Sequence, residues 1–564
     1  PHMNALCYNN VKSDTITTTT ERTFFMLPFS VYEDIYPSRR STLFSNRGMV
    51  CTSIPQASAA GAEILSKGGN AIDAAVAIAA ALPLLEPTSN SIGSDAFAIV
   101  WTNGEIFALN GSGASPRALN ADAVRRAGFT KVPISGWLSV TVPGAPSTWA
   151  ELNRRFGSMS LGELFAPAIK YAEHGFPLSA NTAKMWIKET PRFAHEYKHN
   201  PELYRPWINT YTKEGVPYMA GEIFKCPEYA DTLRELARTN CESFYTGELM
   251  RKMAAFSRAT GGFLSEEDFT SHRCEWVRPL SSNYKGFDVF EMPPNGHGIT
   301  VLMALNILSG LKLGESKDSP QTWHSMIEAL KLAFTDAKAF VADPRAMRTK
   351  VSDMLSPEYA AIRRSLIGEN AISPRVGNPS CGDTVYFCTA DSNGNMVSFI
   401  QSCYQVFGSG VTIPGTGITM QDRAANFSLD PASDNFLEGN KRPYHTIIPG
   451  FLAKDGRPIG PFGVMGGFMQ PQGHLQVLVN MIDYGMNPQQ ALDAPRFQWI
   501  GEKRIQLESS VPQYIIDDLN RRGHEIEIIQ DNIDMGRGQI IYRLPNGVLA
   551  GGTEPRCDGC IALL

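Results

Sequence analysis

Thr384 is the residue of this sequence whose type and position most directly suggest chemistry. It follows Cys381-Gly382-Asp383 and begins an apolar run that is typical of a strand. A threonine hydroxyl is a weak nucleophile at neutral pH, but the free α-amino group of a chain-terminal threonine can act as its base. That amine would exist only if the chain were cut between Asp383 and Thr384. The motif raises the hypothesis of a self-cleaving threonine enzyme, although the spacing alone is weak evidence because many threonines begin strands.

The residues on either side of Thr384 predict the parts that such a cleavage needs. Residues 385–389 and 396–402 are typical of paired strands, and the sequence DSNGN at 391–395 is typical of the turn between them. Upstream, residues 343–383 are rich in Ser, Pro, Asn, Gly and Arg, and we interpret the end of this stretch as a mobile connector. The hairpin would fix the threonine, and the connector could move away after the cut.

Strands and helices alternate along the rest of the chain, which predicts an α+β fold with helices packed on the outer faces of sheets. The pattern does not determine the order of the layers. Gly68-Gly69-Asn70 separates two Ala-rich helical runs, and Ser319-Pro320 marks the start of a long helix. The expected strands are 49–53, 96–101 and 105–109, and the expected helices are 57–66, 71–82, 320–341, 473–481, 488–492 and 510–522.

Length and composition are those of an ordinary globular enzyme. The chain has 564 residues, 43% of them hydrophobic and 19% charged, with a formal net charge of -5. This balance favours neither nucleic acid nor a membrane surface as a partner. The apolar run 71–85 is too short to span a bilayer and contains Asp73 and Pro83, which indicates a buried helix instead.

Expectations about localisation and bound groups come from the chain start and from two residue types. Residues 4–22 are polar and Thr-rich without the hydrophobic run of a secretion signal, so we expect a cytoplasmic protein. The ten cysteines are scattered, which fits reduced buried thiols better than a disulfide framework. The ten histidines show no metal-ligand spacing, and no nucleotide-binding fingerprint is present, so we predict no metal and no cofactor.

Several separate stretches, together with Thr384, resemble γ-glutamyltranspeptidases in the same order over about residues 47–557. They are KGGNAIDAA at 67–75, EP at 86–87, IG at 92–93, VPG at 142–144, MPP at 292–294, DSNGN at 391–395, FGSG at 407–410, KRP at 441–443, GG at 466–467 and APRF at 494–497. The resemblance implies a four-layer αββα fold of the N-terminal-nucleophile hydrolases and self-cleavage before Thr384.

The resemblance also implies how the chain would be divided. Residues 1–46 would be an N-terminal arm whose first three residues look like a remnant of an expression tag. Residues 47–383 would form a heavy subunit and residues 384–564 a light subunit that carries the nucleophile. The two subunits would be each other's partners, and two such pairs could associate as a dimer.

The resemblance assigns catalytic roles to four residues. Thr384 would attack the amide carbonyl of the substrate while its own amine transfers the proton. Gly466 and Gly467 would donate backbone N–H groups to the oxyanion, a role that suits glycine because no side chain blocks the approach. Ser402 stands where the family has a hydroxyl that orients the nucleophile. Without the resemblance, the glycine pair indicates a plain tight turn.

The chain departs from the family where transpeptidases bind the α-carboxylate and α-amine of the γ-glutamyl group. The family arginine that binds the carboxylate aligns with Gly111, in the run LNGSGA at 109–114. The aspartate that binds the amine aligns with Asn426, and a neighbouring glutamine aligns with Arg423. A cation therefore replaces an anion in this neighbourhood, which predicts an acid substrate without an α-amine.

Other substitutions predict new contacts with that acid. The paired serines of the family become His445 and Thr446, and a substrate-binding asparagine becomes Tyr404. Arg423 could bind a carboxylate bidentately while these three side chains donate further hydrogen bonds, and the larger Tyr404 would shrink the cavity. Two plainer interpretations stand beside this one: Arg423 could form a surface ion pair, and His445 could only pack under a loop.

The prediction is a self-processing threonine amidohydrolase that acts on a small acid amide. The relative that fits best is an oxamate amidohydrolase of purine breakdown, which would form oxalate and ammonia. An acylase acting on a larger acyl amide, such as a glutaryl type, comes next, and γ-glutamyl hydrolysis or transfer comes third. A relative that is never cut and has no catalytic role is the alternative of another class. The choice between water and an amine as acceptor stays open.

Overall fold

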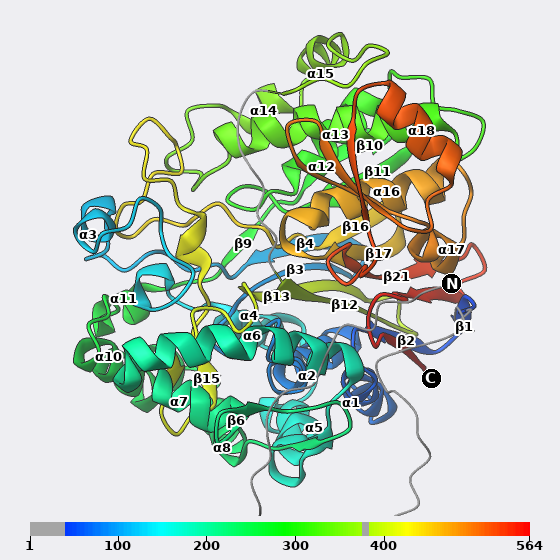
Figure 1. Cartoon of the computed structure of the whole chain (residues 1–564). Helices are drawn as coiled ribbons and strands as arrows, with labels where there is room; N and C mark the ends of the chain where they lie inside the picture. The colour runs from blue at the N-terminus through cyan, green and yellow to red at the C-terminus, as the bar shows by residue number, and fades with distance from the viewer. Residues whose placement is uncertain (1–39, 375–382) are drawn as a thin grey trace, which may run out of the picture.

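Two seven-stranded sheets lie face to face in the computed structural model, which describes residues 40–374 and 383–564 (Figure 1). Both sheets are antiparallel throughout. The first contains, in spatial order, β23 (Cys560–Leu563), β2 (Gly48–Thr52), β12 (Asp383–Asp391), β13 (Met396–Tyr404), β3 (Asp95–Thr102), β4 (Glu105–Asn110) and β9 (Glu275–Val277). The second contains β1 (Leu43–Ser45), β22 (Leu549–Thr553), β21 (Arg537–Arg543), β17 (Arg457–Met465), β16 (Gly450–Lys454), β11 (Phe287–Glu291) and β10 (Leu280–Tyr284).

Helices cover the outer face of each sheet, so the layers follow one another as helix, sheet, sheet, helix (Figure 1). The first sheet is covered by α1 (Pro55–Ser66), α2 (Ala71–Leu85) and α4 (Ala145–Phe156), with α5 (Leu161–His174) packed on α2. On the second sheet lie α12 (Ile299–Leu308), α16 (Gln470–Ile482) and α17 (Pro488–Asp493), with α13 (Pro320–Phe340) packed on α12 and α18 (Gln513–Arg521) on α13. This confirms the expected αββα sandwich.

The remaining elements are shorter or peripheral. The helices are α3 (Ala121–Arg126), α6 (Ala180–His199), α7 (Pro201–Tyr211), α8 (Pro227–Arg238), α9 (Ser243–Thr246), α10 (Glu248–Ala259), α11 (Glu266–Ser271), α14 (Val351–Met354) and α15 (Pro357–Arg364), with 3-10 turns η1 (Trp137–Ser139), η2 (Arg423–Asn426) and η3 (Gly467–Met469). The strands are β5 (Phe176–Pro177), β6 (Thr212–Lys213), β7 (Val216–Pro217), β8 (Ile223–Phe224), β14 (Thr412–Ile413), β15 (Ile418–Thr419), β18 (Phe497–Gly501), β19 (Arg504–Glu508) and β20 (Glu525–Ile529).

Helix α2 shows why an almost uniformly apolar run becomes a buried helix. Every residue from Ala71 to Leu85 is buried. Asn70 accepts hydrogen bonds from the backbone N–H groups of Ile72 and Asp73, and Asp73 accepts one from the backbone of Asn70, which completes a capping box. The sequence predicted an end near Leu82, but the helix continues through Pro83 to Leu85, because burial stabilises a turn that propensity alone disfavours.

Both parts of the predicted precursor contribute strands to each sheet. In the first sheet, β12 and β13 lie between β2 and β3, so residues after 383 are enclosed by strands from residues before it. In the second sheet, β16 pairs with β11. A cut between Asp383 and Thr384 would therefore leave the two parts hydrogen-bonded along several strands.

Some predicted segments lie partly or wholly outside the described residues. The end of the predicted connector, 375–382, is one of these segments, and most of the predicted N-terminal arm, 1–39, is the other. The arm is tied to the fold over its last residues, since β1 pairs with β22 and Arg40 donates to the carbonyl of Glu554 at 2.8 Å. The upstream part of the 343–383 stretch forms α14 and α15.

Two findings bear on the predicted environment of the chain. Within residues 40–374 and 383–564, no helix is both long enough and apolar enough to cross a bilayer. The cysteines of the same ranges are free thiols, as expected, and most of them are buried.

Asp391 connects the turn after β12 to the start of α2, which gives a test of the fold. Its carboxylate accepts hydrogen bonds from the backbone N–H groups of Ala71, Asn393 and Asn395. We predict that Asp391→Ala lowers the free energy of unfolding by about 1–3 kcal/mol, because it leaves buried donors unpaired. Urea unfolding measures this loss, and Asp517→Ala on the exposed face of α18 is the control. Equal stability of the two variants would contradict the assignment.

Candidate active site

Thr384 lies at a β-bulge at the start of β12. Asp383 pairs with Tyr404 and Val385 pairs with Gln401, so the single residue Thr384 faces two residues of β13, Ser402 and Cys403. Bulges of this kind redirect side chains and are common beside active sites. Tyr404, which closes the bulge, has a φ of 79°, a left-handed conformation that costs free energy for a side chain other than glycine.

The hydroxyl of Thr384 is held by two side chains. It donates to Ser402 Oγ at 3.1 Å and accepts from Gln470 Nε2 at 3.2 Å. Ser402 Oγ also accepts the backbone N–H of Tyr404 at 2.8 Å, and Gln470 Oε1 accepts the N–H of Ile448 at 3.0 Å. Thr384, Ser402 and Gln470 are fully buried. The nucleophile predicted from sequence is thus oriented by the predicted serine and by a glutamine that sequence reasoning missed.

The Gly466-Gly467 pair lies between the end of β17 and the start of α16. Both residues have positive φ, 133° and 55°, which favours glycine at each position. Gln470 is the first residue of α16 and contacts Thr384, so this turn lies close to the Thr384 hydroxyl. The tight turn proposed as an alternative is therefore real. It leads into a helix N-terminus, where backbone N–H groups favour negative charge.

Arg423 is fully buried, so the interpretation as a surface ion pair is wrong. Its guanidinium lies over the Tyr404 ring, 4.8 Å from the centroid, and Nη1 donates to Thr446 Oγ1 at 2.6 Å. Nε and Nη2 are buried and have no hydrogen-bond partner among the described residues. Burial lowers the pKa of Arg423, and the nearby Asp95 carboxyl partly opposes that shift.

His445 is also buried, and both of its ring nitrogens are engaged within the chain. Nε2 lies 3.0 Å from Asp95 Oδ2, and Nδ1 lies 3.4 Å from the backbone nitrogen of Ile447. Burial holds the pKa of His445 well below its ordinary value and raises that of Asp95 to about 7, so both shifts favour neutral forms. This geometry favours the packing interpretation of His445 over direct contact with substrate.

Gly111, at the position of the family's carboxylate-binding arginine, has no room for a side chain. A Cβ built there would lie 1.9 Å from Thr148 Oγ1 and 2.8 Å from the carbonyl oxygen of Ala96. The loss of that arginine is therefore part of the packing of β3, β4 and α4.

Asn426 lines a cavity of about 540 Å³ beside this cluster. Its Nδ2 is buried without a hydrogen-bond partner among the described residues. Two further residues line the same cavity: Tyr444, which precedes His445, and Phe468, which follows Gly467. The structure thus brings the predicted Thr384, Ser402, Tyr404, Arg423 and Thr446 into one connected cluster, with Asn426 facing the adjoining space.

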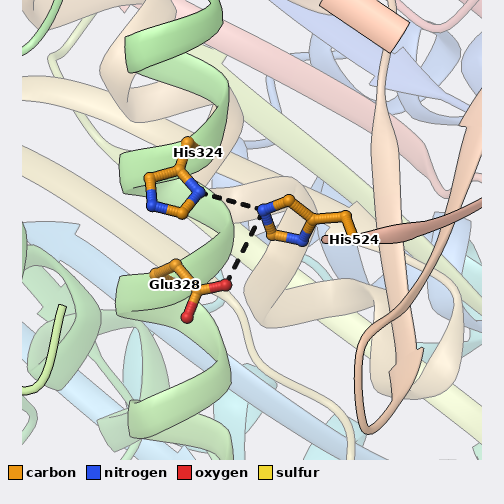
Figure 2. Close-up of side chains that lie close together, drawn as sticks. All are labelled: His324, Glu328 and His524. Atoms are coloured by element: carbon orange, nitrogen blue, oxygen red, sulfur yellow. Dashed lines mark hydrogen bonds and ion pairs between the residues drawn. The ribbon is translucent and has the colours of Figure 1, made fainter. Parts of the chain in front are cut away.

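A second group of buried side chains lies away from this site. His324 and Glu328 lie one turn apart on α13, and His524 reaches them from the segment after α18 (Figure 2). His324 Nδ1 lies 2.9 Å from His524 Nε2, and His324 Nε2 lies 2.9 Å from the Gly368 carbonyl oxygen. Lys331 Nζ donates to Glu328 Oε1 at 2.7 Å. The donors could hold a metal ion, but a cation there would face the Lys331 ammonium, so we interpret the group as a structural network.

Comparison with known proteins defines the class to which this fold and site belong. The family model described as gamma-glutamyltranspeptidase matches residues 57–564. The chain therefore belongs to the gamma-glutamyltranspeptidase family, whose members here are amidohydrolases, acylases and transpeptidases acting on amide C–N bonds.

Three similar proteins indicate the range of activities within the family. A glutathione hydrolase-like YwrD proenzyme of Bacillus subtilis is 35% identical over 92% of this chain and 98% of its own length. An oxamate amidohydrolase proenzyme of Klebsiella pneumoniae is 34% identical over 93% of this chain and 99% of its own. The crystal structure of a cephalosporin acylase from Bacillus halodurans is 52% identical, with a TM-score of 0.92, and covers 95% of this chain and 99% of that one.

Gln470 provides a test of the geometry around the nucleophile. In Gln470→Glu, an oxygen can still accept the N–H of Ile448, but the donor to Thr384 is lost. We predict a roughly two- to tenfold fall in kcat for amide hydrolysis, the effect of about 0.5–1.5 kcal/mol. Gln490→Glu, at the exposed start of α17, is the matched control and should keep full kcat. Full activity of both variants would remove Gln470 from the site.

Proposed function

We propose that the chain cuts itself between Asp383 and Thr384. Thr384 Oγ attacks the carbonyl carbon of Asp383; as the C–O bond forms, the C–N bond breaks and the Thr384 amine is released. Water then hydrolyses the resulting ester, which leaves the Asp383 carboxylate and the free hydroxyl. The hydrogen bonds from Gln470 and to Ser402 support this proposal, because they hold the hydroxyl in place before the cut. Two of the similar proteins above are named proenzymes.

The products of this cut would be a heavy part, 47–383, and a light part, 384–564. Their shared sheets support a stable pair after cleavage. In the mature protein, the Thr384 amine would take the hydroxyl proton during attack on a substrate amide and pass it to the leaving amine. Backbone N–H groups of Gly466 and Gly467 would stabilise the oxyanion, each contributing about 3 kcal/mol.

The substrate we propose is the amide of an acid that carries a carboxylate and lacks an α-amine. The observation that carries this proposal is the buried guanidinium of Arg423, with two donors unpaired and no carboxylate within ion-pair distance among the described residues. A planar guanidinium binds a carboxylate bidentately. A γ-glutamyl group would need a cation for its α-carboxylate and an anion for its α-amine. Gly111 does not provide the cation, and Asn426 does not provide the anion.

The cavity beside the cluster favours an amide substrate larger than oxamate. A space of about 540 Å³ lined by Asn426, Tyr444 and Phe468 far exceeds the needs of a two-carbon acid amide. The similarity to a cephalosporin acylase also supports a substrate larger than oxamate. Oxamate hydrolysis, with its place in purine breakdown, is the second candidate, supported by the buried cation and by the oxamate amidohydrolase relative.

Intact mass under denaturing conditions tests the self-cleavage. We expect the wild-type chain to give two masses that divide between Asp383 and Thr384. Thr384→Ala should give one uncut chain without turnover, because it has no nucleophile, while Thr384→Ser should still be cut. A wild-type chain that stays whole and inactive would support the uncut, non-catalytic relative. Cleavage of Thr384→Ala would exclude Thr384 as the nucleophile.

Arg423 variants test the charge of the acyl group. We predict that Arg423→Met raises KM roughly ten- to hundredfold for acyl amides that carry a carboxylate, since a hydrogen bond to a charged group contributes about 1.5–3 kcal/mol. Arg423→Lys keeps the charge but loses the bidentate geometry, so its KM for these amides should lie between those of the wild type and Arg423→Met. Steady-state release of the amine gives both constants, with neutral acyl amides and oxamate as comparison substrates. Equal KM values for anionic and neutral acyl groups in the wild type would contradict the proposal.

A further inference from the structure

The cavity beside the proposed active site is lined by a cationic side chain other than Arg423. Lys338, on α13, shares this cavity with Asn426, Tyr444 and Phe468. Its Nζ lies over the Phe468 ring, 4.4 Å from the centroid, and makes no hydrogen bond or ion pair with any described residue. An ammonium group that is largely surrounded by protein and has no anionic partner is costly, so this position is suited to an anionic ligand.

One residue of the cavity wall, Phe468, is next in the chain to a proposed oxyanion donor. Phe468 directly follows Gly467, the proposed oxyanion donor, and its ring stacks on Tyr444 with centroids 6.0 Å apart. The wall also includes the exposed residues Asp430 and Ala432, so the cavity opens to solvent there. Arg423, by contrast, is fully buried and is not part of the cavity wall.

The direction of the reaction assigns the two cations to different halves of the substrate. During an amide hydrolysis, the acyl group becomes bound to Thr384 and stays, while the amine leaves first and must reach solvent. The acyl group therefore belongs on the closed side, with Arg423. The leaving amine belongs on the open side, with Lys338.

We propose that Lys338 binds a carboxylate carried by the amine half of the substrate. The substrate class would then be an amide between a carboxylate-bearing acid and an amino acid or similar anionic amine. This inference rests on the proposed function and extends it, since ammonia released from a primary amide would have no group for Lys338 to bind.

The protonation of Lys338 agrees with this role. Burial lowers the pKa of Lys338 to about 7. The charged or titratable groups near it are Asp430 and Tyr444, which line the same cavity, and the neutral His297, whose pKa burial lowers to about 3. The ammonium is present below pH 7 and is lost above it, and a bound carboxylate would raise its pKa.

Four synthetic amides distinguish the contributions of the acyl half and the amine half of the substrate to KM. The acyl group is a five-carbon acid with or without a terminal carboxylate, and the amine is glycine or glycinamide. In Lys338→Met, which keeps an apolar stem, we expect KM to rise at least tenfold for both glycine amides. Both glycinamide amides should keep their wild-type KM and kcat, and Lys338→Arg should restore most of the affinity for glycine amides.

Two further results complete the test. Lys454→Met removes a lysine that lies over an aromatic ring, Phe287, outside the cavity, and should change none of the four KM values. The proposal would be overturned if Lys338→Met weakened substrates according to their acyl carboxylate, whatever the amine, or changed none of them. Wild-type protein that is cut but hydrolyses none of the four amides would overturn the proposed function itself, and this inference with it.

Discussion

The pairing of β12 between β2 and β13 is the constraint on which the rest of the site depends. It fixes Thr384 at the end of a central strand, and the register shift against β13 places Ser402 beside its hydroxyl. Because the neighbouring strands come from both sides of residue 383, the hydroxyl can be oriented while the chain is whole and remain so after a cut. A nucleophile placed on a terminal loop would have no such support.

The second sheet provides the backbone N–H groups of the proposed site, which β12 alone cannot provide. β17 packs against β12 so closely that a Cβ at Gly463 would lie 2.4 Å from the Tyr386 ring. This close approach brings the end of β17, the glycine pair and the first residue of α16 close to Thr384. Backbone N–H groups at a helix start attract negative charge without a cationic side chain. The two sheets thus each contribute one half of the proposed chemistry.

Charge in the region proposed to bind the acyl group differs from the predicted family pattern in a physically consistent way. Tight packing at Gly111 excludes a long side chain, and the cation is instead Arg423, from a different segment. Asp95 and Asp422 lie near enough to influence this cation, but neither carboxylate forms an ion pair with it. Similar proteins that share this frame are named for glutathione, oxamate and cephalosporin substrates. We propose that specificity in this chain depends on a few side chains around η2, residues 444–446 and α13.

The sequence by itself determined the local elements and the prediction of Thr384 as the nucleophile. Apolar periodicity and turn residues predicted the hairpin after Thr384, the buried helix α2 and the tight turn at Gly466-Gly467, because those features depend on neighbouring residues. Only the tertiary structure decided that Arg423 is buried, that Gln470 contacts Thr384 and that Lys338 lines the cavity. Their partners are far apart in the chain: His445 meets Asp95 across 350 positions, and Gln470 meets Thr384 across 86. Burial and pairing over such separations come from packing, which no local pattern encodes.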